Sequence, residues 1–138
     1  MNKVIVNIKS VQKTIGEEDG IIEFVTEGEV TFKNDSLYVL YKESELSGME
    51  GNTTTLKIHG DTVIMKRYGS ASSKIEYKVG HECTSQYHTP YGVFNLITNT
   101  KELMIDIKDN KEGKINIAYD MKIENLMESF NTLEISFR

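Results

Sequence analysis

Residues 115–122 have the sequence INIAYDMK, and every second side chain in this stretch is large and apolar. The apolar side chains belong to Ile115, Ile117, Tyr119 and Met121, and those between them are small or polar. Successive side chains of a β-strand point to opposite faces of the sheet, whereas an apolar helix face repeats every three or four residues. This stretch is therefore predicted to form a strand with one buried face and one solvent-exposed face.

The same two-residue alternation recurs along most of the chain, with turn signals between the alternating runs. It is visible in residues 22–32, 75–79, 103–107 and 133–137. The turn signals are rich in glycine, asparagine and aspartate and occupy residues 16–20, 34–35, 48–52, 60–61, 69–73 and 109–113. Gly60-Asp61 suits a type II′ hairpin, because glycine adopts the positive φ that this turn requires. Many short strands without intervening helices are typical of a sandwich or a barrel.

These patterns predict one all-β domain over residues 1–138, an antiparallel up-and-down barrel of about eight to ten strands. The interior of a barrel of this size is either filled by side chains or holds one small ligand. Residues of one strand that are an even number of positions apart have the same parity and point to the same face of the sheet. The parity of the apolar residues places six side chains inside, namely Phe24, Phe32, Leu56, Ile117, Tyr119 and Ile135.

Residues 121–132 interrupt the alternation. Ile123, Leu126, Met127 and Phe130 recur at helical spacing, which predicts either a short amphipathic helix or a long hairpin loop. Such a segment would lie as a lid over the core or, as the alternative, would bind a partner or touch a membrane. The spacing alone leaves both conformations open.

The charge pattern argues against nucleic acid and membranes as partners. The formal net charge is -5, and Lys66 and Arg67 form the only adjacent basic pair. Phosphate backbones and anionic membrane surfaces both require a concentrated basic face.

Cys83 is the only cysteine, so the chain has no internal disulfide. Because residues 1–11 also lack the unbroken apolar stretch of a secretory signal, we expect a cytoplasmic protein.

Three segments together carry a resemblance to a known family: residues 63–69 (VIMKRYG), 87–92 (YHTPYG) and 113–119 (GKINIAY). In this order and spacing they resemble the YwiB-like family, small bacterial proteins with a domain-of-unknown-function label, over nearly the whole chain. The resemblance implies a calycin-like, or lipocalin-like, β-barrel, and it implies no activity. True lipocalins carry a Gly-x-Trp motif near the first strand, whereas this chain has no tryptophan. A ligand-carrier function therefore does not follow from the fold.

The residues that could supply catalysis or bind a metal do not form a recognisable motif. Cys83 and His81 share a strand face, but His88 has the opposite parity, and zinc needs about four converging ligands. We interpret Cys83 as an unreactive strand cysteine without a metal. The acidic loop of residues 17–19 has no second acidic cluster with which to form an acid–base pair. Phosphate-binding glycine loops and nucleophile elbows are also absent from the sequence, so we expect no cofactor and no enzyme activity.

Arg67 is the most informative polar residue, because it shares parity with Val63 and Met65 and should point into the barrel. A buried guanidinium needs a partner that offsets its desolvation. In one interpretation Arg67 is a structural contact near a barrel end, paired with Glu43, Glu45 or backbone carbonyls.

In the other interpretation Arg67 receives the anionic head group of a ligand, with Tyr87, Thr89 and Tyr119 as hydroxyl donors. The two interpretations correspond to two functions. One is a binding module for a small anionic or amphipathic molecule. The other is a structural or protein-interaction barrel with a filled core, for which a homodimer is one form. A connected cavity of a few hundred cubic ångströms beside Arg67 favours binding, and a solid core favours the alternative.

Overall fold

The computed structural model describes residues 2–44 and 51–138. The described residues form ten strands: β1 (Asn2–Lys13), β2 (Gly20–Lys33), β3 (Ser36–Lys42), β4 (Thr53–His59), β5 (Thr62–Tyr68), β6 (Ser73–Tyr77), β7 (Glu82–Thr89), β8 (Gly92–Lys108), β9 (Glu112–Ile123) and β10 (Met127–Phe137). In this part of the chain we find no helix of the length and apolarity that a membrane crossing needs.

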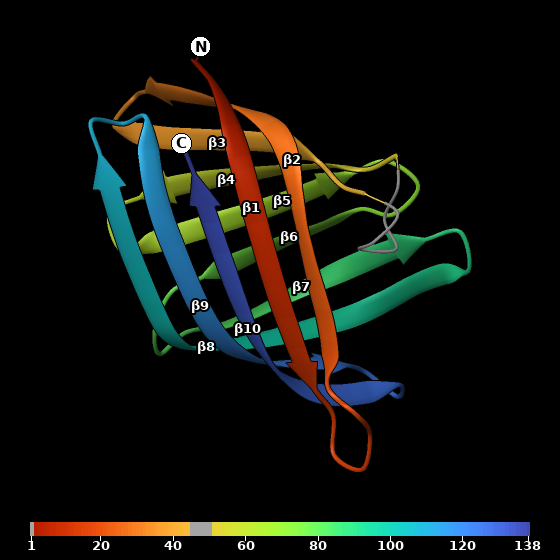
Figure 1. The fold of residues 1–138 in the computed structure, drawn as a ribbon. Coiled ribbons are helices and arrows are strands. Elements are labelled where there is room, and N and C mark those ends of the chain that lie inside the picture. The colour runs from red at the N-terminus through yellow and green to blue at the C-terminus, as the bar shows by residue number, and fades with distance from the viewer. Residues whose placement is uncertain (1, 45–50) are drawn as a thin grey trace.

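The strands form one antiparallel sheet that curls into a nearly closed barrel (Figure 1). Their order is β6-β5-β4-β3-β2-β1-β10-β9-β8-β7, so the first and last strands of the chain pair with each other. The two outer strands, β6 and β7, meet where Ser72 and His88 exchange backbone hydrogen bonds of 2.9 Å in both directions. The predicted all-β, up-and-down barrel is thereby confirmed.

The hairpin turns follow from residues that tolerate a positive φ. Gly60 has a φ of 58° and connects β4 to β5 together with Asp61, whose φ is not positive. A positive φ at the first loop position alone is the pattern of the predicted type II′ turn. Between β2 and β3, Asn34 and Asp35 both have positive φ, at 52° and 61°, as a type I′ turn requires.

One end of the barrel has a dense apolar core. Val6, Val39, Leu56, Ile115 and Ile135 are fully buried there, because strict alternation brings their side chains together from five different strands. Of the six side chains predicted to lie inside, four are buried and Tyr119 is half-buried.

The prediction for Phe32 is wrong, because its side chain is 51% exposed. Phe32 has the inward parity of Val30, but β2 pairs with the described part of β1 only as far as Val30. Phe32 therefore lies past the rim of the barrel, beside the turn into β3. Parity predicts the side of the sheet and not the height along the barrel axis.

Residues 121–132 form a hairpin and not a helix. β9 continues to Ile123, and β10 begins at Met127 directly opposite it. The turn between them has Asn125 at a φ of 65° and a hydrogen bond of 3.0 Å from Leu126 N–H to the Ile123 carbonyl. The spacing of four between Ile123 and Met127 is thus a cross-strand pair around a three-residue turn, which mimics a helical repeat.

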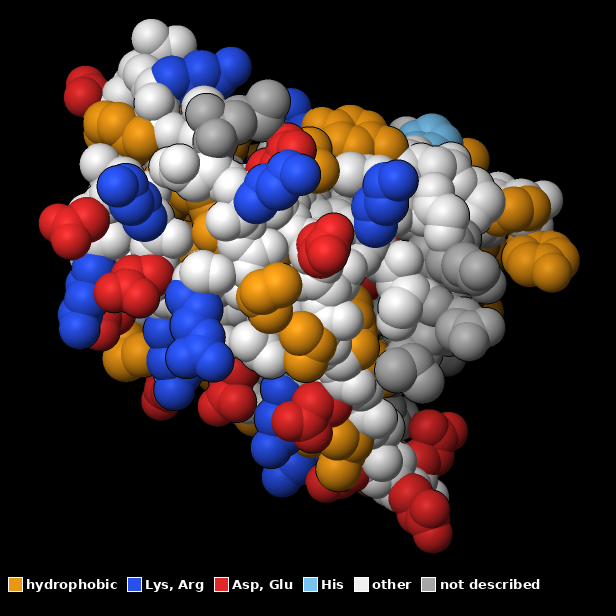
Figure 2. Space-filling view, turned by 45° about the horizontal axis from the view of Figure 1, so that its top comes forward, with side chains coloured by type: hydrophobic (Ala, Val, Ile, Leu, Met, Phe, Trp, Pro, Cys, Tyr) orange, Lys and Arg blue, Asp and Glu red, His pale blue; other side chains and the backbone are white. Residues whose placement is uncertain are grey.

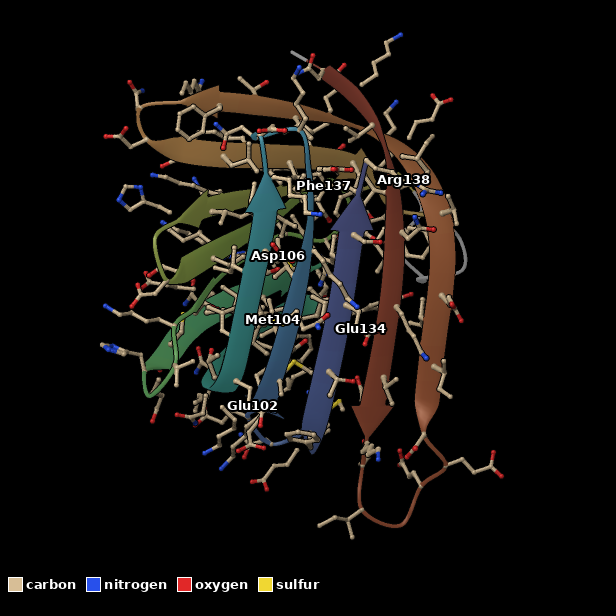
Figure 3. The ribbon with its side chains drawn as sticks, turned by 60° about the vertical axis from the view of Figure 1, so that its left-hand side comes forward. Glu102, Met104, Asp106, Glu134, Phe137 and Arg138 are labelled. Carbon is tan, nitrogen blue, oxygen red and sulfur yellow. The ribbon has the colours of Figure 1, made fainter. Side chains whose placement is uncertain are left out.

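The outer surface of the barrel is mixed in charge, and exposed apolar side chains lie among the charged ones. Glu102, Met104 and Asp106 on β8 and Glu134 on β10 are exposed on the outer face (Figure 3). On the face that Figure 2 shows, basic and acidic side chains are interspersed across the described residues, and the basic ones do not gather into one area.

Gly28 is required by the close approach of β1 and β3 to β2. A Cβ at this position would lie 2.6 Å from the Leu40 carbonyl oxygen and 2.7 Å from a methyl group of Val6. We expect Gly28→Ala to destabilise the protein by about 1–3 kcal/mol, because the core must shift to admit the methyl group. Urea unfolding measures this change.

Gly20→Ala is the matched control, because a Cβ there would meet no heavy atom closer than 3.8 Å. It should leave the free energy of unfolding unchanged or raise it by less than about 1 kcal/mol. Equal stability of the Gly28→Ala variant and the parent would contradict the packing described for Gly28.

Candidate functional site

The other end of the barrel is hollow. A cavity of about 260 Å³ lies inside it, lined by inward side chains that include Ile8, Phe24 and Leu133. The cavity extends toward the end of the barrel that carries the β1–β2 loop and the β9–β10 turn (Figure 1), where Ile22 and Met127 line its rim. The barrel therefore combines a packed half with a half that has space for a small molecule.

A row of polar side chains crosses the wall of this cavity. Strand pairing places Tyr41 on β3 opposite Thr54 on β4, Thr54 opposite Arg67 on β5, and Arg67 opposite Ser73 on β6. Directly opposite residues of antiparallel strands share a face. Glu43, two residues after Tyr41, joins this row from the chain that follows β3, and it also lines the cavity.

Arg67 points into the barrel and forms an ion pair with Glu43, as one interpretation of the sequence predicted. Arg67 Nε lies 3.6 Å from Glu43 Oε1, and the same carboxylate oxygen accepts a hydrogen bond of 2.5 Å from Thr54 Oγ1. Glu45, the other proposed partner, lies outside the described residues. Arg67 Nε is buried and has no hydrogen-bond partner among the residues that the structure describes, because 3.6 Å is too long for one.

Three tyrosines surround the guanidinium and remain protonated. Burial and the Glu43 carboxylate raise the pKa of Tyr41 well above its ordinary value, although Arg67 lowers it in part. Burial likewise raises the pKa of Tyr77 and of Tyr119, whose ring centroids are 4.9 Å apart. Burial lowers the pKa of Arg67, but its electrostatic interactions with Tyr41, Glu43, Tyr77 and Tyr119 together raise it by more. The site therefore presents one cation, one carboxylate and several neutral hydroxyl groups.

The structure brings three of the four predicted site residues together. Arg67, Tyr87 and Tyr119 all line the cavity. Thr89 does not join them, because its hydroxyl donates to the Gly92 carbonyl at 3.0 Å and accepts the Tyr91 N–H at 3.1 Å. Thr89 therefore holds the turn between β7 and β8.

Sequence reasoning missed two of the residues closest to Arg67. Tyr41 and Tyr77 are fully buried and line the cavity, yet neither was among the predicted hydroxyl donors. Their signal was present in the alternation, because Tyr41 shares parity with Val39 and Tyr77 shares parity with Ile75.

Cys83 lies where the barrel closes. Its Sγ accepts a hydrogen bond from the Glu76 N–H across the junction of β6 and β7, at 3.4 Å. His81 is exposed, and His88 contributes its backbone to the pairing with Ser72. Among residues 2–44 and 51–138, no group of three or more His, Cys, Asp or Glu side chains could hold a metal ion.

Comparison with known proteins assigns the family. A family model described as "Domain of unknown function (DUF1934)" matches residues 6–135. The chain belongs to this family. It is similar to the "Uncharacterized beta-barrel protein YwiB" of Bacillus subtilis (strain 168), at 29% identity over 129 residues that make up 91% of this chain and 88% of the relative.

A solved structure supports the same assignment. The crystal structure of the ywiB protein from Bacillus subtilis matches with a TM-score of 0.86 at 26% identity, covering 99% of this chain and 90% of the other. The family resemblance inferred from the three sequence segments is thus confirmed. The descriptions of these relatives name no ligand and no activity.

The ion pair predicts how the ligand-free protein responds to loss of Arg67. We expect Arg67→Met to lower the free energy of unfolding by about 1–3 kcal/mol, because the Glu43 carboxylate then stays buried without its cation. Adding Glu43→Gln to this variant should recover part of the loss, because the amide is neutral and still accepts from Thr54. Chemical denaturation of the single and double variants measures both effects.

The matched control is Lys66→Met, which removes a cation from the neighbouring, exposed position of β5. It should change stability by less than about 0.5 kcal/mol. If Arg67→Met were instead more stable than the parent, the guanidinium would be an uncompensated charge and the described pairing would be wrong.

The buried tyrosines predict a loss of stability at alkaline pH. The folded-state pKa values of Tyr41, Tyr77 and Tyr119 lie above the ordinary value of 10.0. Their contribution is therefore fully present below about pH 10 and is lost as the pH rises toward the folded-state values, because the unfolded chain releases these protons first. Urea unfolding at a series of pH values should show this fall.

Tyr77→Phe should reduce the slope of the alkaline fall, because one of the shifted groups is gone. Tyr91→Phe is the control, since Tyr91 is 93% exposed and its loss should leave the slope as it is in the parent. The same slope in all three proteins would count against the buried hydroxyl groups as its cause.

Proposed function

We propose that this protein binds a small, partly apolar anion inside its barrel. The observation that carries the proposal is the cavity of about 260 Å³ beside Arg67, in a barrel whose other half is filled by fully buried side chains. Interior space of this kind favours the binding function over that of a structural or protein-interaction barrel with a filled core. Ligand sites are concave, mostly apolar and equipped with a few convergent polar groups, as this cavity is.

The difference in exposure of the two charged side chains favours an anion over a cation. The Arg67 side chain is 24% exposed, whereas that of Glu43 is 3% exposed. More of the Arg67 side chain than of the Glu43 side chain is therefore available to a molecule in the cavity. Arginine offers several N–H groups in a fixed planar arrangement, so one face can remain paired with Glu43 while another receives a ligand oxygen.

The remaining lining suits an amphipathic molecule. Tyr41, Tyr77 and Tyr119 supply hydroxyl groups near the guanidinium, and Phe24 and Met121 supply apolar surface. Apolar contact contributes affinity in proportion to the area removed from water, and the polar end fixes orientation. We place this binding function in the cytoplasm, where a single unpaired cysteine is ordinary.

Thermal unfolding of the parent and of Arg67→Met, each with a panel of carboxylic acids and phosphorylated metabolites, tests the proposal. We expect at least one compound to raise the midpoint of the parent, since a ligand at about 100 times its Kd stabilises by about 2.7 kcal/mol. The same compound should leave Arg67→Met unchanged, because the guanidinium that receives it is missing.

Native mass spectrometry of freshly purified protein supplies the second measurement. A small molecule retained by the parent and lost from Arg67→Met supports the proposal. An unloaded parent whose midpoint no compound shifts would contradict it and leave the structural or protein-interaction barrel as the better account.

A further inference from the structure

The charge balance of the cavity constrains the kind of anion that fits, if the proposed binding function holds. Among the described residues that line the cavity, Arg67 and Glu43 are the charged ones, so their formal charges sum to zero. A ligand with one negative charge leaves a net charge of one in the site, and a ligand with two leaves a net charge of two. Moving an uncompensated charge out of water costs free energy, and this cost rises steeply with the size of the charge.

Glu43 is held in place and cannot withdraw to accommodate an anion. Thr54 Oγ1 donates to its carboxylate at 2.5 Å, and its backbone N–H donates to the Asn52 carbonyl at 2.9 Å. Asn52 is itself 1% exposed. The carboxylate therefore stays near any head group that reaches Arg67 and repels the second charge of a dianion more strongly than it opposes a monoanion.

The neutral groups around Arg67 can satisfy a carboxylate but not a phosphate monoester. The hydroxyls of Tyr41, Tyr77 and Tyr119 donate one hydrogen each, and the described lining contains no lysine. Phosphate monoesters carry nearly two charges and three acceptor oxygens, and proteins bind them with several cations or with backbone N–H groups of a helix or loop. This cavity is built from strand side chains and has neither.

The size of the cavity limits the size of the whole ligand. An engineered cavity of about 150 Å³ holds benzene, with its six carbon atoms. By proportion, the 260 Å³ here accommodates about ten non-hydrogen atoms. The apolar lining of Ile8, Phe24, Leu96 and Leu133 surrounds this space.

From this combination we infer that the ligand is a monocarboxylic acid of about ten non-hydrogen atoms in all, most of them in a compact apolar body. Its carboxylate binds the accessible side of the Arg67 guanidinium, among the tyrosine hydroxyls, while Glu43 remains on the other side. Glu43 thereby acts as a selectivity residue that excludes doubly charged phosphate esters. This inference rests on the proposed function and adds the class of ligand to it.

Isothermal titration of the full chain with compounds that share one aromatic body tests the inference. The probes are phenylacetate, benzyl phosphate, 2-phenylethanol and 2-phenylethylamine, and octanoate is the aliphatic counterpart. We expect phenylacetate or octanoate to bind at least about ten-fold more tightly than each of the other three, because only they place one negative charge on Arg67. Arg67→Met should remove this advantage of the carboxylates over 2-phenylethanol.

Glu43→Gln should selectively improve the binding of benzyl phosphate, so that its gap to phenylacetate narrows by about ten-fold or more. Glu134→Gln is the matched control, since Glu134 is exposed on the outer face of β10 and its loss should leave the ranking intact. Circular dichroism verifies that each variant is folded. The ranking measured on the parent alone decides the inference if Glu43→Gln does not fold.

The outcomes separate this inference from the proposal beneath it. Benzyl phosphate binding as tightly as the carboxylates would overturn the monocarboxylate assignment and keep an anion site. Tightest binding of 2-phenylethylamine or 2-phenylethanol would overturn both the assignment and the anion site. If none of the five probes binds the parent, and native mass spectrometry shows no retained molecule, the proposed function fails as well.

Discussion

The ion pair between Arg67 and Glu43 is the interaction on which the hollow half of the barrel depends. A guanidinium inside a β-barrel persists only with a countercharge and ordered hydrogen bonding, because desolvation otherwise exceeds any gain. Glu43 supplies the charge from the end of β3, and Thr54 on the strand between them fixes the carboxylate. The pair thus links three neighbouring strands at the level where the apolar core ends.

The two halves of the interior have different physical roles. Fully buried side chains such as Val39, Leu56 and Ile135 fill one half, and their removal from water is the main source of stability for the fold. The other half leaves a cavity that apolar side chains do not fill, at a cost in packing. A strand barrel suits this division, because each long strand contributes side chains to both halves while its backbone hydrogen bonds continue unbroken.

Much of this arrangement could be predicted from the sequence, since a period of two specifies which face of each strand is buried. That rule predicted that Arg67 points inside, and it named Glu43 among the possible partners, beside Glu45 and backbone carbonyls. It could not predict the height of a residue along the barrel axis, and for this reason the positions of Phe32 and Thr89 at the rim were not predicted. It also could not separate a helix from a tight hairpin over residues 121–132, because cross-strand neighbours around a short turn reproduce helical spacing.

The most direct test of the account is nuclear magnetic resonance of the arginine Nε–H groups during titration with phenylacetate. The chain has two arginines, Arg67 and Arg138, so the second signal is an internal control on an exposed side chain. The account predicts that the Arg67 signal shifts in a saturable manner as the carboxylate binds its guanidinium, and that the Arg138 signal stays in place. An unchanged Arg67 signal, while signals elsewhere in the protein respond to the ligand, would contradict it.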